Sequence, residues 1–290
     1  MKDIRQSLLW EGYLERLGWK TVLINSTRVY IRKIPFGSII KIPRVDLVIP
    51  FEKIDEVAKK EKAFFVKIEP NVKIDDEKLF STLASYGCQE ESWSLQPTKT
   101  ITIDLTQNEG ELISNIEKDT RYSIRRSERE GVVVTESDEF EKFLKLHQET
   151  AKRQRFWVSY EDSKTLWESL PKENKTLLFA RKDKEILAGA FLLFYEDTAY
   201  YYQAGSSKSR RDLLAPYLLV WESLRLSKAR GCKIFDFEGI VDPRIKATRR
   251  WHGFTHFKRG FGGEEVTYLG SFIKFYNPVI KLIFSLNKFL

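Results

Sequence analysis

The sequence predicts a mixed α/β fold built from two similar lobes. Helical and extended patterns alternate along the chain, and 42% of its 290 residues are hydrophobic, which is enough to form buried cores. A helical stretch, a glycine and a cysteine that opens an extended run occur twice, at Gly87-Cys88 and at Gly231-Cys232. Because the two copies lie half of the chain apart, they indicate a duplicated unit.

The first half of the chain opens with an amphipathic helix over residues 4–17, in which Leu9, Tyr13 and Leu17 recur at helical spacing. The other elements that we expect in this half are helices over 51–62, 75–86 and 108–130 and strands over 21–35, 38–50, 63–69 and 98–105. The last of these strands alternates threonine with isoleucine. The last helix is long and charged, and Gly131 closes it.

The second half repeats this mixture. We expect helices over 139–153, 163–170 and 213–230 and strands over 177–180, 185–204, 233–238 and 265–275. Glu196-Asp197 marks a turn inside the long extended region. The helix over 213–230 is the central helix of this half.

The composition limits the class of protein. A net charge of +8 favours a polyanionic or phosphorylated partner. Cys88 and Cys232 are too few for a disulfide framework or a metal quartet, so we expect reduced thiols. Charged residues follow Met1 at short intervals and no uncharged apolar run reaches ~18 residues, so we expect neither a signal peptide nor a membrane-spanning helix. A cytoplasmic protein is the expectation.

The segment from Gly253 to Gly263 is the most informative part of the sequence. No acidic residue stands between Asp242 and Glu264. This interval contains six lysines and arginines and two of the three histidines: Arg244, Lys246, Arg249, Arg250, Lys258, Arg259, His252 and His256. Such a segment has a positive potential, and its glycines let backbone N–H groups approach a ligand closely. A basic surface loop that ends in a hairpin is the alternative interpretation.

Four motifs occur along the chain in a fixed order. The last one joins Phe235-Asp-Phe-Glu-Gly-Ile240 to Phe257-Lys-Arg-Gly-Phe-Gly-Gly-Glu264. The other three are Ile34-Pro-Phe-Gly37 with Ile42-Pro-Arg44, Thr100–Leu105 with Asp119–Arg126, and Tyr202–Ser207 with Ala215–Glu222. Together they resemble the Fem family, the aminoacyltransferases that build peptidoglycan cross-bridges. The chain is most similar to the FemX-like type, because it has no long helical arm, although the usual Gly-Pro after Arg44 is missing.

This resemblance implies two tandem lobes, each like the GNAT acyltransferase fold. Residues 1–135 would bind the acceptor, and residues 136–290 would bind the donor and carry catalysis. The implied reaction moves an amino acid from aminoacyl-tRNA to the stem-peptide amine of a peptidoglycan precursor, either UDP-linked or lipid-linked. Because the tRNA ester is already activated, we expect no ATP, no metal ion and no other cofactor. We also expect a monomer, in the cytoplasm or at the inner face of the membrane.

Two residues are the candidates for catalysis. The resemblance places Lys258 where its charge would stabilise the oxyanion at the reacting carbonyl; the alternative is a lysine whose stem packs on Phe257 and whose head lies in water. Asp104 ends an alternating strand, where it would orient the attacking amine or accept its proton, unless it is an ordinary turn aspartate. Asp236 and Glu238 are predicted to share a face of one strand, as a carboxylate pair or as partners of nearby arginines.

Candidate binding residues surround these two. Tyr217 and Ser206 stand at the start of the central helix, which is a plausible anion or carbonyl site, although capping explains the serines equally well. Phe257 and Arg259 flank Lys258 and belong to the basic segment that would meet phosphates. Arg121 is predicted to share a helical face with the arginine four positions later, as a phosphate clamp or as a solvated face. The resemblance assigns Lys33 to the nucleotide portion of the acceptor.

Several other functions stay open. The histidines have no zinc spacing, and no Walker loop, dinucleotide fingerprint or GNAT pyrophosphate loop is present. The alternatives are a GNAT-related N-acyltransferase with an acyl-CoA-type donor and a non-catalytic protein that binds RNA or an anionic surface. Residues 271–290 are expected to pack on their own domain; a peripheral membrane contact is the alternative, with Lys274, Lys281 and Lys288 spaced seven apart among apolar residues.

Overall fold

The computed structural model describes residues 2–74 and 76–287. The chain divides into two compact units. Unit 1 comprises Met1–Thr98, Arg244–Lys246 and Thr267–Leu290, and unit 2 comprises Lys99–Pro243 and Ala247–Val266. This division differs from the predicted boundary after residue 135, because unit 2 already begins at Lys99 and the end of the chain returns to unit 1. Asp75, where a helix was expected to start, and Lys288 lie outside the described residues.

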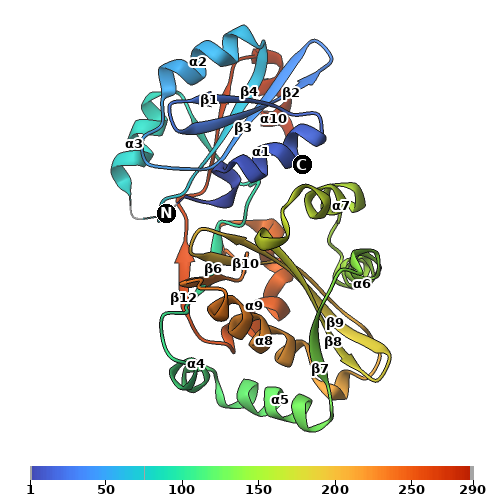
Figure 1. Cartoon of the computed structure of the whole chain (residues 1–290). Helices are drawn as coiled ribbons and strands as arrows, with labels where there is room; N and C mark the ends of the chain where they lie inside the picture. The colour runs from blue at the N-terminus through green and yellow to red at the C-terminus, as the bar shows by residue number, and fades with distance from the viewer. Residues whose placement is uncertain (1, 75, 288–290) are drawn as a thin grey trace. The chain divides into compact units, whose positions relative to one another are not determined.

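Unit 1 is built on a six-stranded sheet with the order β1-β2-β3-β4-β13-β5 (Figure 1). The strands are β1 (Lys20–Ile24), β2 (Thr27–Ile34), β3 (Gly37–Val45), β4 (Ala63–Pro70), β5 (Gln89–Glu91) and β13 (Ser271–Phe275). The helices are η1 (Ile4–Gln6), α1 (Leu8–Arg16), α2 (Phe51–Lys60), α3 (Glu77–Ser85) and α10 (Pro278–Asn287). The strand alternation splits the sheet into two faces: Val66 joins the core formed with α2 and α3, whereas the ring of Phe65 meets Phe284 of α10.

Unit 2 is built on a seven-stranded sheet with the order β12-β6-β11-β10-β9-β8-β7 (Figure 1). The strands are β6 (Lys99–Asp104), β7 (Val133–Ser137), β8 (Lys175–Lys182), β9 (Glu185–Tyr195), β10 (Thr198–Ser206), β11 (Ile234–Asp236) and β12 (Glu264–Thr267). The helices are α4 (Glu109–Asn115), α5 (Lys118–Arg129), α6 (Phe140–Gln154), α7 (Tyr160–Ser169), η2 (Lys172–Asn174), η3 (Arg211–Leu213), α8 (Ala215–Ala229), α9 (His252–Arg259) and most of η4 (Lys246–Trp251).

The central helix α8 and the helix α6 pack on the unit 2 sheet through different residues. Leu219 of α8 belongs to the main core cluster together with Leu192 of β9. The ring of Phe143 on α6 contacts Phe191, the neighbour of Leu192 that points to the other face of the strand. Gly205 on β10 allows α6 to pack closely on the sheet, because a Cβ at this position would lie 3.0 Å from the α6 backbone. Any larger residue would push α6 away from the end of β10.

The two units repeat one topology, as the sequence suggested, but the repeated elements differ from the predicted ones. In unit 1, α2 joins the parallel strands β3 and β4, and in unit 2 α8 joins the parallel strands β10 and β11. Each pair continues into an antiparallel strand from elsewhere in the chain, β13 or β6. The Gly87-Cys88 and Gly231-Cys232 segments therefore do not occupy equivalent places. They look alike because both glycines have positive φ values, 78° and 83°, that end a helix.

Local patterns also failed at four other places. The strand expected over 21–35 is a hairpin, β1 and β2, and the strand expected over 265–275 is split between β12 and β13, which belong to different sheets. The helix expected over 108–130 is broken into α4 and α5, because the Glu117 N–H leaves the helix pattern and donates to Gly260 O at 2.9 Å. The basic segment, for which a loop and hairpin was the alternative, forms helix α9.

Among the described residues no helix is both long enough and apolar enough to cross a bilayer.

Candidate functional site

Lys258 reaches from α9 to the chain that leaves β11. Its ammonium group donates to Phe237 O at 2.9 Å and to Gly239 O at 2.6 Å. Both carbonyls are available because the chain turns sharply here, with φ values of 57° at Glu238 and 116° at Gly239. Two of the three N–H groups of the ammonium are thereby held in a fixed direction. The lysine is anchored, and its head does not lie in open water.

The environment of Lys258 changes its protonation. Burial lowers the pKa of Lys258 to about 8, against the opposing influence of the Asp236 and Glu238 carboxylates, which raise it. The ammonium therefore remains mostly protonated at neutral pH. Asp236 is itself held, since its Oδ1 accepts from Thr100 Oγ1 at 2.6 Å and from the Glu238 N–H at 2.8 Å. The carboxylate pair predicted on one strand is not formed, because β11 ends at Asp236 and Glu238 lies in the turn.

A cavity of about 410 Å³ opens at the start of α8. It is lined by residues of α6, β9, the β10–α8 loop, α8 and α9: Arg153, Gln154, Leu187, Ser206, Ser207, Ser209, Arg210, Arg211, Leu214, Ala215, Pro216, Tyr217 and Phe257. None of these lining residues is acidic. Leu214, the residue before α8, has a φ of 54°, which is unusual for a branched side chain and marks a strained approach to the helix.

Three arginines, Arg153, Arg210 and Arg211, give the lining of this cavity a positive charge. Arg153 donates through Nη2 to the backbone oxygen and to the hydroxyl of Ser206, both at 3.0 Å. Its Nε and Nη1 are buried without a protein partner. Burial and the neighbouring Arg211 lower the pKa of Arg153. Unpaired guanidinium N–H groups beside a helix N-terminus are the groups that bind phosphate or carboxylate.

Aromatic rings form the apolar wall of the cavity and connect it with Lys258. The ring centroids of Tyr217 and Phe257 lie 5.0 Å apart in a T-shaped contact. Phe261 stacks on Tyr217 at 6.2 Å and meets Phe257 at 5.3 Å, so the cluster ties the start of α8 to α9. Phe257 faces the cavity and Lys258, the next residue of the same helix, reaches the end of β11. The cavity and the ammonium of Lys258 are therefore linked through packed elements of unit 2.

The structure brings together part of the predicted site. Ser206, Tyr217 and Phe257 all line the cavity; Lys258 is not a lining residue but directly follows Phe257 on α9. The sequence reasoning missed the three cavity arginines, Arg153, Arg210 and Arg211. Arg210 directly precedes η3 and Arg211 begins it, a few residues before α8. Paired cations just before a helix were the signal that could have indicated them.

Asp104 does not join this group. Its Oδ1 accepts from the backbone N–H and the hydroxyl of Thr106 at 2.8 and 2.7 Å, and these bonds lower the pKa of Asp104. In the sheet Asp104 is paired with Ile234, at the start of β11, whereas Lys258 reaches the chain beyond the end of β11. The turn interpretation of Asp104 fits this geometry, because the two candidate catalytic residues lie at opposite ends of the strand.

The remaining predicted binding residues already have protein partners. Arg121 donates through Nη1 to Ser114 O at 2.9 Å and to a second carbonyl at the end of α4, so it caps that helix. Arg259 pairs with Glu265 at 2.6 Å on the surface. Lys33 pairs with Glu61 at 2.6 Å in unit 1. A phosphate of the acceptor would have to compete with the Glu61 carboxylate for this lysine.

Comparisons with known proteins agree with this architecture. A family model described as the FemAB family matches residues 19–162 and 161–289. The lipid II:glycine glycyltransferase of Staphylococcus epidermidis is 24% identical over 298 residues, which cover 78% of this chain and 70% of that protein. The crystal structure of FemX matches with a TM-score of 0.82 at 19% identity, over 97% of this chain and 94% of that chain. A tandem GNAT protein from the clavulanic acid biosynthesis pathway matches with a TM-score of 0.50 at 10% identity, over 86% and 78%. The prediction of two tandem GNAT-like lobes is confirmed.

Proposed function

Because this chain belongs to the FemAB family, we propose that it is an amide-forming aminoacyltransferase of peptidoglycan cross-bridge synthesis. It would take an amino acid from aminoacyl-tRNA and transfer it to the stem-peptide amine of a peptidoglycan precursor. The S. epidermidis relative, named for glycine transfer to lipid II, supports a lipid-linked precursor as the acceptor. The arginine-lined cavity, whose wall includes the residue before Lys258, is the observation that carries the proposal.

The cavity suits the 3′ end of a charged tRNA. A tRNA end presents phosphodiesters, a terminal base and an ester-linked amino acid. Arg153, Arg210 and Arg211 at the start of α8 would bind the phosphates, since no lining residue is acidic and the ion pair of Arg210 with Asp183, at 3.8 Å, is an exposed pair that a phosphate can displace. The rings of Tyr217 and Phe257 give a stacking surface for the base or ribose.

The chemical step needs no nucleophile from the protein. The acceptor amine attacks the ester carbonyl, and a C–N bond forms while the carbonyl oxygen gains negative charge. The tetrahedral intermediate then loses the ribose oxygen, which takes up the proton that the amine gives away. The products are an amide on the acceptor and an uncharged tRNA. The enzyme must align amine and ester and must stabilise the oxyanion.

Lys258 is the residue that we assign to the oxyanion. Two carbonyls hold its ammonium, and the third N–H is available to a substrate oxygen. Because burial has already removed much of its hydration, the ammonium needs little reorganisation when the charge develops. The proton on Lys258 is essential to this role, which a neutral amine would fill poorly.

A transfer assay tests the proposal. Radiolabelled amino acids on a mixed pool of tRNAs are offered with nucleotide-linked and lipid-linked precursors, to the wild type and to Lys258→Met. Label in a precursor, lost in the variant, would establish the reaction and name the donor. A folded wild-type protein that transfers nothing from any charged tRNA would refute it.

An acyl-CoA donor is the second candidate, and the position of the cavity favours it. A helix N-terminus that follows a central strand and carries three arginines would also hold a pyrophosphate. The loop from Ser207 to Leu214 contains no glycine, however, so it offers fewer close backbone N–H groups than a glycine-rich phosphate loop. Saturable binding of coenzyme A that blocks the cavity would favour this donor. Salt-dependent RNA binding that ignores aminoacylation, without any transfer, would favour a binding protein.

A further inference from the structure

Helix α10 is apolar on two sides, but unit 1 covers only one of them. On the covered side, Phe284 packs against Phe65 and Phe275 with ring centroids 5.6 and 5.3 Å apart. On the other side four apolar side chains at helical spacing i, i+3, i+4 and i+7 are 46–62% exposed: Val279, Leu282, Ile283 and Leu286. We call these four residues the α10 stripe. A surface helix normally turns polar residues to water, so a second apolar stripe calls for a partner.

The charge around the stripe is positive. The sequence has no acidic residue after Glu265. Lys281, on the flank of the stripe, is exposed. A helix with an apolar stripe, lysine at its flank and no acid matches the pattern of helices that lie in the headgroup region of an anionic membrane.

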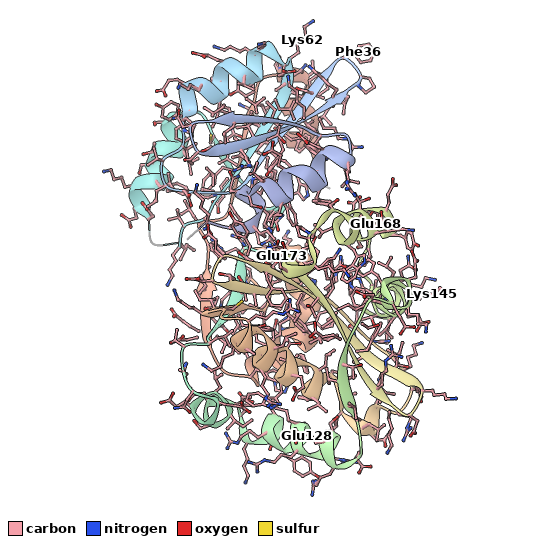
Figure 2. All side chains as sticks on the ribbon, viewed as in Figure 1. Phe36, Lys62, Glu128, Lys145, Glu168 and Glu173 are labelled. Carbon is pink, nitrogen blue, oxygen red and sulfur yellow. The ribbon has the colours of Figure 1, made fainter. Side chains whose placement is uncertain are left out.

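A second exposed apolar residue stands near the start of α10. Phe36, at the tip of the β2–β3 hairpin, is 97% exposed. The Tyr276 N–H donates to Phe64 O at 3.0 Å, and the Ser38 N–H donates to Lys62 O at 3.1 Å. These bonds bring the hairpin tip, the α2–β4 turn and the start of α10 to one end of the sheet. Figure 2 shows Phe36 and Lys62 together at that end of unit 1.

This end of the sheet is basic as well. Three lysines in and before the α2–β4 turn are exposed: Lys59, Lys60 and Lys62. Glu61, the acid among them, is buried and pairs with Lys20 and Lys33 at 2.7 and 2.6 Å. The charge of Glu61 is therefore neutralised by its two lysine partners. The surface around Phe36 presents the exposed lysines of the α2–β4 turn to the solvent.

We propose that the α10 stripe and Phe36 dock unit 1 on an anionic lipid bilayer. The helix would lie in the plane of the headgroups with its stripe among the upper acyl chains, Phe36 would enter beside it, and the surrounding lysines would meet lipid phosphates. The apolar contacts give the surface its affinity, and the cations give it a preference for anionic lipid. This inference does not depend on the proposed reaction, because membrane binding is measured without any substrate.

Vesicle sedimentation tests the proposal. The full-length wild type is mixed with vesicles of equal parts phosphatidylglycerol and phosphatidylcholine, and with vesicles of phosphatidylcholine alone. We expect binding to the anionic vesicles that weakens as salt is added. The double variant Leu282→Gln, Leu286→Gln should weaken binding roughly 10-fold or more, because two exposed leucines no longer enter the bilayer. Phe36→Asn should weaken it roughly 10-fold, and asparagine tolerates the φ of 69° at this position.

Val133→Gln is the matched control, since this valine is 58% exposed on β7 of unit 2 and lies outside the proposed surface. It should bind vesicles like the wild type. Circular dichroism confirms that each variant is folded, as expected for exposed positions. Equal binding by the wild type and the double leucine variant would overturn the proposal. So would a wild type that ignores anionic vesicles and instead dimerises through the stripe in analytical ultracentrifugation.

Discussion

Replacing Lys258 by methionine removes the ammonium group but keeps an unbranched side chain in the same space. The variant loses a half-buried cation that Phe237 O and Gly239 O hold in place, together with the third N–H that we propose for the substrate. Deleting a preorganised donor to an oxyanion typically lowers kcat by ~100- to 1,000-fold, or about 3–4 kcal/mol. We expect a loss of that size in kcat of Lys258→Met, with KM for the acceptor changed by less than ~3-fold.

The pH dependence separates this role from the others. Because burial lowers the pKa of Lys258 to about 8, kcat of the wild type should fall as pH rises through about 8. Lys258→Arg, if it retains activity, should keep it at higher pH, since arginine stays protonated. A kcat that rises through pH 8 in the wild type but not in Lys258→Arg would refute the reasoning, because it would mean that the neutral amine of Lys258 acts as a base.

A second lysine controls for purely structural effects. Lys228 also donates to a carbonyl beside a strand end, Leu105 O at 2.8 Å, but it lies in the last turn of α8, whereas the cavity opens at the start of that helix. Lys228→Met therefore removes a comparable structural bond without touching the proposed site. We expect its kcat to match that of the wild type. A loss as large as that of Lys258→Met would assign both lysines to stability alone.

Three further predictions follow from the geometry. Arg153→Met should raise KM for the charged tRNA roughly 10- to 100-fold with a smaller change in kcat, measured by steady-state transfer, because a half-buried cation is lost from the cavity. Asp104→Ala should leave kcat within ~2-fold of the wild type, since its carboxylate serves a turn with Thr106; a large loss would return it to the mechanism. Burial lowers the pKa of His147 to about 4. Between about pH 6.5 and pH 4 the histidine is therefore protonated in the unfolded chain but neutral in the folded chain, so the folded state loses stability as pH falls. Urea unfolding should show stability decreasing by up to ~3 kcal/mol over that window, and His147→Gln should flatten the decrease.

The sequence was informative where one local pattern decides the structure. The helices α2, α6 and α8 were predicted within a few residues, because their apolar spacing and end residues agree with their packing. The patterns failed where tertiary partners decide. Residues 265–275 look like one strand, yet Gly270 adopts a φ of 119° and sends the chain from one sheet to another. The helix over 108–130 breaks because Gly260 O offers the Glu117 N–H a partner outside the helix.

The candidate site divides in the same way. The motifs indicated Tyr217 and Phe257 because they lie in continuous segments of the chain. Arg153 could not be recognised, because an arginine at the end of α6 looks like any solvated cation in sequence. It reaches the cavity only through the close packing of α6 on β10 at Gly205, a contact between residues far apart in the chain. Asp104 was misleading for the opposite reason, since the end of a strand does not reveal which end of the sheet holds the site.

Mass spectrometry of the acceptor gives the most direct test of the central claim. A lipid-linked precursor is incubated with the wild type and either charged tRNA or an acyl-coenzyme A, and the mass of the product is measured. The proposed function predicts a mass gain of one amino-acid residue on the stem peptide, only with charged tRNA. A gain of the acyl group from coenzyme A, or an unchanged acceptor with every charged tRNA, would contradict it.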